Sequence, residues 1–381
     1  MKPLRPFQFL SLFFLLILSI LLGACTAAEE NSSNENIEMA IRKTPAAIMP
    51  KDLSKTATAS LSAIGDVLIH DSVYLDAETE SGYDFNPMFA KIKPYLEKSD
   101  ITVANSESII GGSEIGVSTY PSFNSPFEVG DALKTAGVDV VTMANNHTLD
   151  RGEKAIANAI NYWDKIGMTR TGSALSIEES ANIATHTENG ITFSFLSYTY
   201  GTNGIPTPSG KDYLVNRIDK AKIKEDIKRA KAQSDAVVLS LHFGQEYERL
   251  PNDEQKKLAK FSAEQGADII LGSHPHVLQP PEWIETADGR KSFVIYSLGN
   301  FISHQQDVYR RIGGILHITI EKTVDKDGSE IRLKDPAFTA TYVKNTGNRN
   351  FKIDLLANID PGRNKEIQKH LSTWTKDLNF E

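Results

Sequence analysis

From about residue 57 onward, short apolar segments alternate with amphipathic segments, and this alternation limits the fold more than any other feature of the chain. The amphipathic segments have helical spacing, and several of them end at a glycine, which commonly terminates a helix. Apolar runs of strand length lie at 60–64, 101–104, 138–143, 236–241 and 268–271. Strands that alternate with helices along a chain predict the α/β class.

Polar residues follow these strands at the points where the strands end. Asp66, Glu107, Asn146, His242 and His274 come from five segments that lie far apart in the sequence. In α/β sheets, functional sites gather at the carboxyl ends of the strands. We therefore expect these side chains to meet in one site.

The residue types in this set favour a metal site. The acid, amide and imidazole candidates are Asp66, His70, Glu107, Asn146, His147, His242, His274 and His276. Mixed imidazole and carboxylate ligands suit Zn, Mn or Fe better than Ca or Mg. In His274-Pro275-His276 the proline favours an extended His274, and residues two apart in an extended segment point the same way. Both imidazoles are thus expected to reach the same site.

The N-terminus has the organisation of an export signal. Lys2 and Arg5 precede an apolar run at 7–22, and small residues follow it, which is typical of a signal peptide. The alternative is a plain transmembrane anchor, because the run is close to the lower limit of about 17 residues for a membrane span. The chain has one cysteine, Cys25, so it forms no intramolecular disulfide.

The segment Leu22-Gly23-Ala24-Cys25 resembles the lipobox of bacterial lipoproteins. The resemblance implies that cleavage after residue 24 leaves Cys25 as the first mature residue, carrying the lipid. The protein would then be anchored to the cell membrane, with its fold on the extracytoplasmic face.

Composition completes the predicted organisation. Residues 25–58 have low hydrophobicity, which predicts a flexible tether after the signal peptide at 1–24. The main domain is expected at 59–345 and a C-terminal extension at 346–381. The formal charge of −8 argues against a nucleic-acid partner, since such proteins carry basic surfaces. It would also repel an acidic polymer at long range, so any such contact needs metal ions or a basic rim.

Six short motifs occur in order, each after a predicted strand. They are Gly65-Asp66, Asn105-Ser106-Glu107, Asn145-Asn146-His147, His242-Phe243-Gly244-Gln245-Glu246, Gly272-Ser273-His274-Pro275-His276 and Ser297-Leu298-Gly299-Asn300-Phe301. Together they resemble the successive motifs of the CapA family, which serves poly-gamma-glutamate capsule synthesis in bacteria. The resemblance runs from about residue 61 to residue 320. It implies a metallophosphatase-like fold, a four-layer sandwich of two β-sheets flanked by helices.

The resemblance also implies two divalent transition-metal ions, of Mn, Fe or Zn. By this resemblance Asp66 and His276 bind the first ion, Glu107 bridges, and Asn146, His242 and His274 bind the second ion. His147 is the catalytic residue, which protonates the leaving group or stabilises the transition state. This chain departs from the superfamily at two positions. Asp66 lacks the histidine of an Asp-x-His pair, for which His70 is a possible substitute at a different spacing, and Glu107 stands where the superfamily has aspartate. Asn300 is a further possible participant, or a structural turn close to the site.

The leading functional hypothesis is a lipid-anchored CapA-type protein of poly-gamma-glutamate or capsule polysaccharide biosynthesis, with a metal-dependent phosphoesterase-like site. In this hypothesis a metal-activated water attacks a phosphoester. The expected partners are membrane lipid through acylated Cys25, capsule or poly-gamma-glutamate synthase components, and an anionic polymer or phosphoester substrate. Two alternatives stay open: a non-catalytic polymer-binding or scaffold subunit of a membrane synthase or exporter, and a hydrolase of another cell-envelope phosphoester.

Overall fold

A computed structural model describes residues 54–326 and 328–381. The predicted signal peptide, Cys25 and most of the predicted tether lie outside the described residues. Residues 55–58, which the sequence assigns to the tether, are the first residues of strand β1 (Lys55–Val67). Among the helices of the described residues, none is long and apolar enough to span a bilayer.

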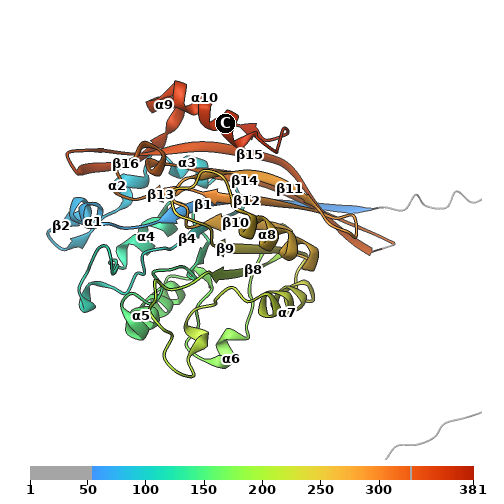
Figure 1. Ribbon diagram of the computed structural model, residues 1–381, viewed down its shortest axis with the longest axis horizontal. Coiled ribbons are helices and arrows are strands. Elements are labelled where there is room, and N and C mark those ends of the chain that lie inside the picture. Colours follow the sequence, from blue (N-terminus) through green and yellow to red (C-terminus); the bar gives the residue numbers. More distant parts are fainter. Residues whose placement is uncertain (1–53, 327) are drawn as a thin grey trace, which may run out of the picture. The chain divides into compact units, whose positions relative to one another are not determined.

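Within the described residues, most strands belong to two large sheets (Figure 1). The nine-stranded sheet has the path β16 (Arg349–Leu355), β15 (Gly328–Thr346), β14 (Ile312–Asp325), β1, β4 (Ile101–Asn105), β5 (Val140–Thr142) and β6 (Thr169–Thr171), with β13 (Asn300–Ile302) on β1 and β17 (Asn379–Phe380) on β15. The six-stranded sheet has the order β11 (Leu278–Glu285), β12 (Lys291–Leu298), β10 (Ile269–Ser273), β9 (Ala236–His242), β8 (Ile191–Thr199) and β7 (Ala184–Glu188). A small hairpin joins β2 (Glu78–Thr79) and β3 (Gly82–Tyr83).

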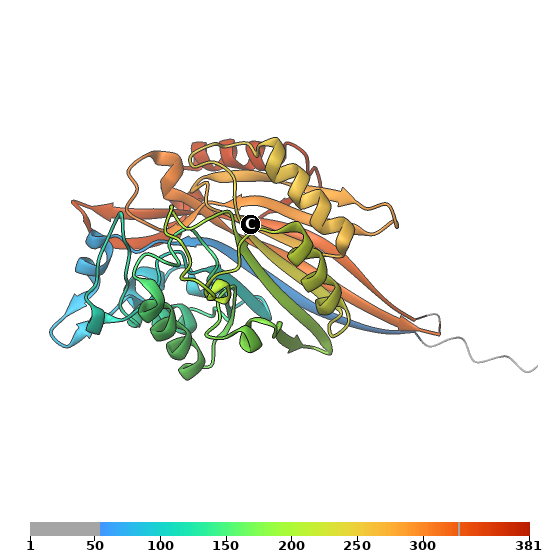
Figure 2. The same cartoon turned by 60° about the horizontal axis from the view of Figure 1, so that its bottom comes forward.

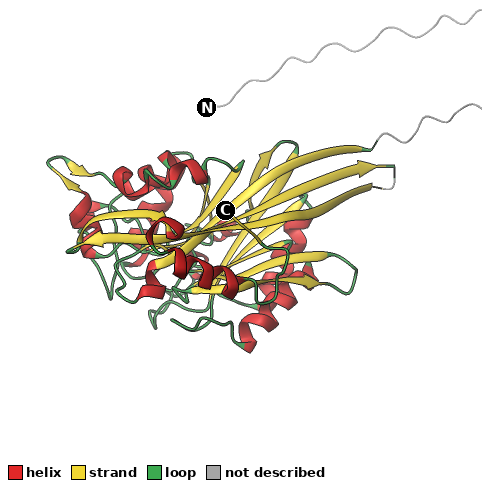
Figure 3. Ribbon diagram, turned by 90° about the horizontal axis from the view of Figure 1, so that it is seen from above, coloured by secondary structure: helices red, strands yellow, loops and turns green. Residues whose placement is uncertain are grey.

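The helices of the described residues range in length from four residues to 14. They are α1 (Asp71–Ala77), α2 (Asn86–Phe89), α3 (Lys93–Leu96), α4 (Glu128–Thr135), α5 (Gly152–Lys165), α6 (Ile177–Ser180), α7 (Lys220–Lys231), α8 (Asp253–Gln265), α9 (Leu356–Ile359) and α10 (Pro361–Leu371). Figure 3 shows helices on both sides of the strands. The sequence of 86–97 favours one helix that Pro94 kinks or shortens, but the segment forms two helices, α2 and α3, with Pro94 in the first turn of the second.

The core explains why the central strands are apolar throughout. Val238 of β9 lies in the cluster between the two sheets, with Leu61 of β1 and Phe195 of β8. The next residue, Leu239, lies in the outer cluster that α7 and α8 cover. Successive side chains of a strand point to opposite faces, so a strand covered on both faces reads as one continuous apolar run.

The opposite outer face is covered in the same way. Val141 of β5 packs in a cluster with Ile156 and Trp163 of α5. The layers are therefore helices, nine-stranded sheet, six-stranded sheet and helices, which confirms the predicted four-layer α/β sandwich.

Distant parts of the chain meet in the nine-stranded sheet. β1 pairs parallel with β4 and antiparallel with β14, so that Lys55 faces Val324 and Ile64 faces Ile315. Figure 2 shows this neighbourhood as the blue β1 beside the orange and red strands. Residues 346–381, which the sequence sets apart as an extension, add β16 to the edge of the sheet and pack α10 against β11.

Candidate metal-binding and catalytic site

The nine-stranded sheet delivers three predicted residues to one place. Asp66 stands at the end of β1, and Glu107 follows β4 by two residues. β13 pairs parallel with β1 in a register that sets Asn300 opposite Asp66. All three side chains are fully buried.

The six-stranded sheet supplies the imidazoles. His242 ends β9 and lies opposite Ser273 of β10 in the ladder, so His274 follows directly at the same edge. The prediction of an extended His274 is wrong: His274 has φ 97° and His276 has φ 59°. The chain turns sharply between β10 and β11, and this turn rather than an extended segment directs both imidazoles into the site. Non-glycine residues with positive φ are uncommon and concentrate at functional sites.

Glu107 is the centre of the arrangement. Its Oε1 lies 3.6 Å from Nε2 of His242, and its Oε2 lies 3.7 Å from Nδ1 of His276. Both oxygens are buried, and neither accepts a hydrogen bond from any described residue. Burial, and next the nearby charge of Asp66, raise the pKa of Glu107 well above its ordinary value. The charge of His276 acts in the opposite direction.

Asp66 is held by neighbours from both sheets. Its Oδ1 accepts a hydrogen bond of 2.8 Å from Nδ2 of Asn105, and its Oδ2 lies 3.1 Å from Nδ1 of His276. Burial disfavours the His276 cation, but the charges of Glu107 and Asp66 outweigh it and raise the pKa of His276 to about 9.

The pKa values of the other two imidazoles, His242 and His274, shift in the opposite direction. Burial, and next the charge of His274, lower the pKa of His242 well below its ordinary value. Burial, and next the charge of His276, lower the pKa of His274 to about 3. Oδ1 of Asn146 lies 2.8 Å from Nε2 of His242. Both histidines are therefore neutral at pH 7, which is the form that binds metal ions.

These side chains fit a divalent cation. Glu107, His274 and His276 each offer a ligand atom within 4.8 Å of the others. Nδ1 of His274, like the oxygens of Glu107, is buried without a hydrogen-bond partner among the described residues. Buried polar atoms are rarely left without a partner, and a cation with imidazole and carboxylate ligands would satisfy all three atoms.

His147 lies beside this cluster and has its own partner. Its Nδ1 is 2.7 Å from Oδ2 of Asp150 and 3.4 Å from Nδ2 of Asn203. The ring of Phe123 packs edge-on against it at 4.7 Å between centroids. His147 is thus held by a carboxylate on one side and an aromatic ring on the other.

The two possible residues differ in position. Oδ1 of Asn300 lies 3.0 Å from Nδ1 of His276, so Asn300 contacts the site directly. Nδ1 of His70 lies 3.2 Å both from the carbonyl oxygen of Leu68 and from the amide of His304. In the described part of the chain, no hydrogen bond of His70 reaches a cluster residue. Burial lowers the pKa of His70 to about 4.

Three residues of the site are absent from the sequence prediction. Asn105 binds Asp66, Asp150 binds His147, and the ring of Tyr200 lies 4.6 Å from that of His274. Asn105 belongs to the Asn105-Ser106-Glu107 motif, and Asp150 lies three residues after His147, so the sequence position of each could have indicated a role in the site. Tyr200 directly follows β8, which is a weaker indication.

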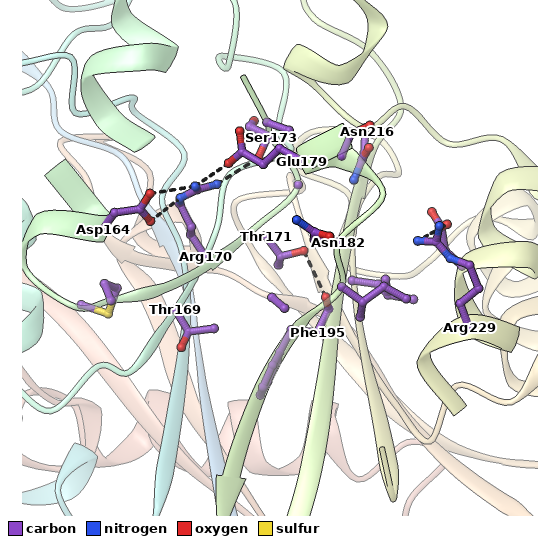
Figure 4. Close-up of a pocket in the computed structure, with 18 residues that line it drawn as sticks. Asp164, Thr169, Arg170, Thr171, Ser173, Glu179, Asn182, Phe195, Asn216 and Arg229 are labelled. Carbon is purple, nitrogen blue, oxygen red and sulfur yellow. Dashed lines mark hydrogen bonds and ion pairs between the residues drawn. The ribbon is translucent and has the colours of Figure 1, made fainter. Parts of the chain in front are cut away.

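Two cavities differ in their relation to the cluster. One, of about 440 Å³, is lined by Tyr200 and by Phe243, which follows His242. Tyr200 therefore forms a wall common to the histidines and to this cavity. The other, of about 320 Å³, shares no lining residue with the cluster (Figure 4). Its Arg170 pairs with Asp164 and Glu179.

Comparisons with known proteins agree with the resemblance seen in the sequence. The chain is 29% identical over 274 residues to "Capsule biosynthesis protein CapA" of Bacillus anthracis, covering 68% of this chain and 63% of that protein. It is 29% identical over 280 residues to "PGA biosynthesis protein CapA" of Bacillus subtilis (strain 168), covering 69% and 68%. The chain thus spans less than two thirds of the length of the first relative.

One solved structure and one family model complete the comparison. The calcineurin-like phosphoesterase YfkN from Bacillus subtilis matches with a TM-score of 0.43 and 15% identity, over 84% of this chain and 100% of that chain. The model of the family described as "Bacterial capsule synthesis protein PGA_cap" matches residues 60–305. This stretch exceeds half of the 381 residues and contains each candidate side chain from Asp66 to Asn300. The chain therefore belongs to the bacterial capsule synthesis family PGA_cap.

Proposed function

We propose that this protein is a metal-dependent hydrolase that acts on a phosphoester in the synthesis of a bacterial capsule polymer such as poly-gamma-glutamate. One observation carries the proposal. The two oxygens of Glu107 are buried without a hydrogen-bond donor among the described residues, and they face different histidines, His242 and His276. A carboxylate placed in this way suits a bridge between two cations.

The residues divide into two ligand groups around that carboxylate. In this proposal Asp66 and His276 would hold one ion, and Asn146, His242 and His274 would hold the other, with Mn, Fe or Zn as the metal. When bound, such ions lower the pKa of water and stabilise charge on phosphoryl oxygens. Thiolate ligands are absent from the described residues, since Cys25 lies outside them.

His147 supplies a proton in this proposal. Asp150 contacts Nδ1 of His147, which leaves Nε2 free to donate to the departing oxygen of the ester. Phe123 packs against the ring and limits its rotation. A carboxylate that orients an imidazole and stabilises its cation is a common device for general acid catalysis.

The cell-envelope setting of the proposal rests on the N-terminal sequence. Lipidation of Cys25 would anchor the protein on the extracytoplasmic face of the membrane, beside the synthase components that make the polymer. The 29% identity to the capsule biosynthesis protein CapA of Bacillus anthracis supports a role in this process.

Metal analysis combined with a substrate panel tests the proposal. The purified full-length chain is expected to contain about two transition-metal ions and to hydrolyse members of a phosphomonoester and phosphodiester panel. His147→Ala should retain the metal and lose hydrolysis. His186→Ala is the matched control, because His186 pairs with Glu188 in the strand β7. Protein without bound metal, or with full activity after His147→Ala, contradicts the hydrolase.

A non-catalytic polymer-binding subunit is the second candidate. It is favoured by the departure at Asp66, which has Asn105 and His276 as partners in place of an Asp-x-His histidine. In that case the protein binds metal and supports polymer formation in cells, and His147→Ala has no effect on either.

A further inference from the structure

Four arginines from three segments of the chain differ in their partners. Arg249 and Arg363 both pair with Glu366, and Arg311 donates two hydrogen bonds to the carbonyl oxygen of Val343. Arg310 differs from these three. Within residues 54–326 and 328–381, its guanidinium has no carboxylate or carbonyl partner, and it stacks on an aromatic ring.

That ring places Arg310 at the metal-ligand cluster. The guanidinium carbon of Arg310 lies 3.5 Å from the ring centroid of Tyr247, and the Tyr247 ring lies 6.1 Å from that of His276. A second connection runs through the backbone. Nδ2 of Asn300 donates to the carbonyl oxygen of Arg310 at 2.7 Å, while Oδ1 of the same amide lies 3.0 Å from His276. Two independent links therefore hold Arg310 near His276.

The aromatic platform is itself fixed in position. The amide of Tyr247 donates a hydrogen bond of 2.8 Å to the carbonyl oxygen of Pro275, the residue between the two histidines of the turn. Tyr247 also has φ 71°, which an aromatic residue adopts only under constraint from its surroundings. The turn that presents His274 and His276 thus also presents the ring under Arg310.

The negative charge of the site indicates a role for the guanidinium of Arg310, namely binding an anionic group. Asp66 and Glu107 are both buried in the cluster, and Glu246 adds a further negative field at Glu107 and His276. A protein with a formal charge of −8 repels an anion at long range. An anionic substrate group therefore needs a cation at the mouth of the site. A half-buried arginine stacked on a fixed ring supplies a pre-oriented fork of donors for two oxygens of one group.

We propose that Arg310, stacked on Tyr247, binds an oxyanion group of the substrate at the mouth of the site. The chemistry recognised is a pair of oxygens on one atom, as in a phosphoryl group or a carboxylate of the polymer. The identity of the substrate rests on the proposed function, but the binding of an oxyanion does not.

Calorimetric titration of the full-length chain, in the presence of Mn²⁺, tests this assignment. The two probes are inorganic phosphate and a γ-linked glutamate pentamer. Arg310→Ala is expected to weaken binding of at least one probe by about 10- to 100-fold. Arg310→Lys should recover only part of the loss, because lysine keeps the positive charge but lacks the planar fork of donors. The probe that is affected identifies the source of the oxyanion.

Arg249→Ala is the matched control. Arg249 also stacks on a tyrosine ring, at 3.9 Å from the centroid of Tyr309, but it is paired with Glu366. The same loss of charge should leave both affinities unchanged. Wild-type protein that binds neither probe, Arg310→Ala protein that binds both as tightly as wild type, or an equal loss in Arg249→Ala overturns the assignment.

Failure of this assignment is distinguishable from failure of the hydrolase. If the wild-type protein hydrolyses no ester while Arg310→Ala selectively loses probe binding, Arg310 keeps its role and the hydrolase is wrong. If hydrolysis occurs and Arg310→Ala leaves both KM and probe affinity unchanged, the hydrolase stands and the role of Arg310 is wrong.

Discussion

Oδ2 of Asp150 lies 2.7 Å from Nδ1 of His147 and also accepts a 2.7 Å hydrogen bond from the amide of Phe123. The carboxylate thus joins the histidine to the loop that carries the ring packed against it. Asp150 has a side chain only 1% exposed, so its contact with His147 is shielded from solvent. This geometry makes Asp150 a positioning residue for His147.

Substitution of Asp150 tests that role. Asp150→Asn should lower kcat by about 10- to 100-fold with little change in KM or metal content, because an amide cannot stabilise the imidazole cation. The pH dependence of kcat should shift with it. Asp164→Asn is the control, since Asp164 is an exposed partner of Arg170. Unchanged kcat in Asp150→Asn would show that His147 works without its carboxylate.

Removal of the metal should affect stability through Glu107. Without a cation, the wild-type protein keeps a buried carboxylate that has no donor among the described residues. Glu107→Gln is therefore expected to be more stable than wild type in excess chelator, by about 1–3 kcal/mol. Urea unfolding with and without chelator measures this difference.

The same experiment has a clear contrary result. Chelator should lower the stability of wild type and leave Glu107→Gln nearly unchanged. Glu285→Gln, which alters an exposed pair with Lys291, should respond to chelator as wild type does. If chelator destabilises Glu107→Gln as much as wild type, Glu107 is not a ligand.

A pH effect on stability is expected from a residue remote from the ligands. Burial raises the pKa of Asp268 from 3.8 to about 6. The folded state therefore retains this proton where the unfolded chain has lost it. The stabilising contribution is complete below about pH 4 and is lost as the pH rises through about 6.

Asp268→Asn should remove this dependence. Its amide oxygen can still accept the hydrogen bond that Asp268 accepts from the amide of Val237. Between pH 4 and pH 6.5, the unfolding free energy of wild type should fall relative to that of Asp268→Asn by about 2 kcal/mol. Denaturant titrations across this range measure the difference, and parallel curves for the two proteins would contradict the assignment.

A close backbone approach beside Asp66 gives a fourth prediction. A Cβ atom at Gly65 would lie 1.8 Å from the carbonyl oxygen of Gly299, which accepts a hydrogen bond from the amide of Asp66. Gly65→Ala should destabilise the fold by about 3 kcal/mol and reduce metal binding. Gly201→Ala is the control, because no atom lies within 4 Å of its added Cβ. Equal melting temperatures for the two variants would rule out the predicted clash.

The sequence predicted features that depend on local pattern. The helical spacing of 253–265 and the glycine that follows it, Gly266, predict a helix over these residues, and α8 has the same bounds. The positions of Asp66, His242 and His274 at or just after the ends of their strands followed from the apolar runs. The assembly of these residues could be expected because parallel strands end at a common edge.

Features set by contacts between distant segments could not be predicted in the same way. The positive φ of His274 and His276 depends on the turn that joins β10 to β11, and the proline rule favoured the opposite conformation. The direct contact of Asn300 with His276 depends on the pairing of β13 with β1. Arg310 acquires its position only through Tyr247, more than sixty residues earlier in the chain.

The long strand β1 has a mechanical consequence. Lys55 and Asp66 stand near its two ends, about 36 Å apart for eleven residues of strand. A pull on the chain ahead of Lys55 acts along the strand and loads its ladders with β14 and β4 in shear. Many hydrogen bonds then share the force before it reaches Asp66. The ladders of β1 therefore protect the position of Asp66 from a pull on the far end of the strand.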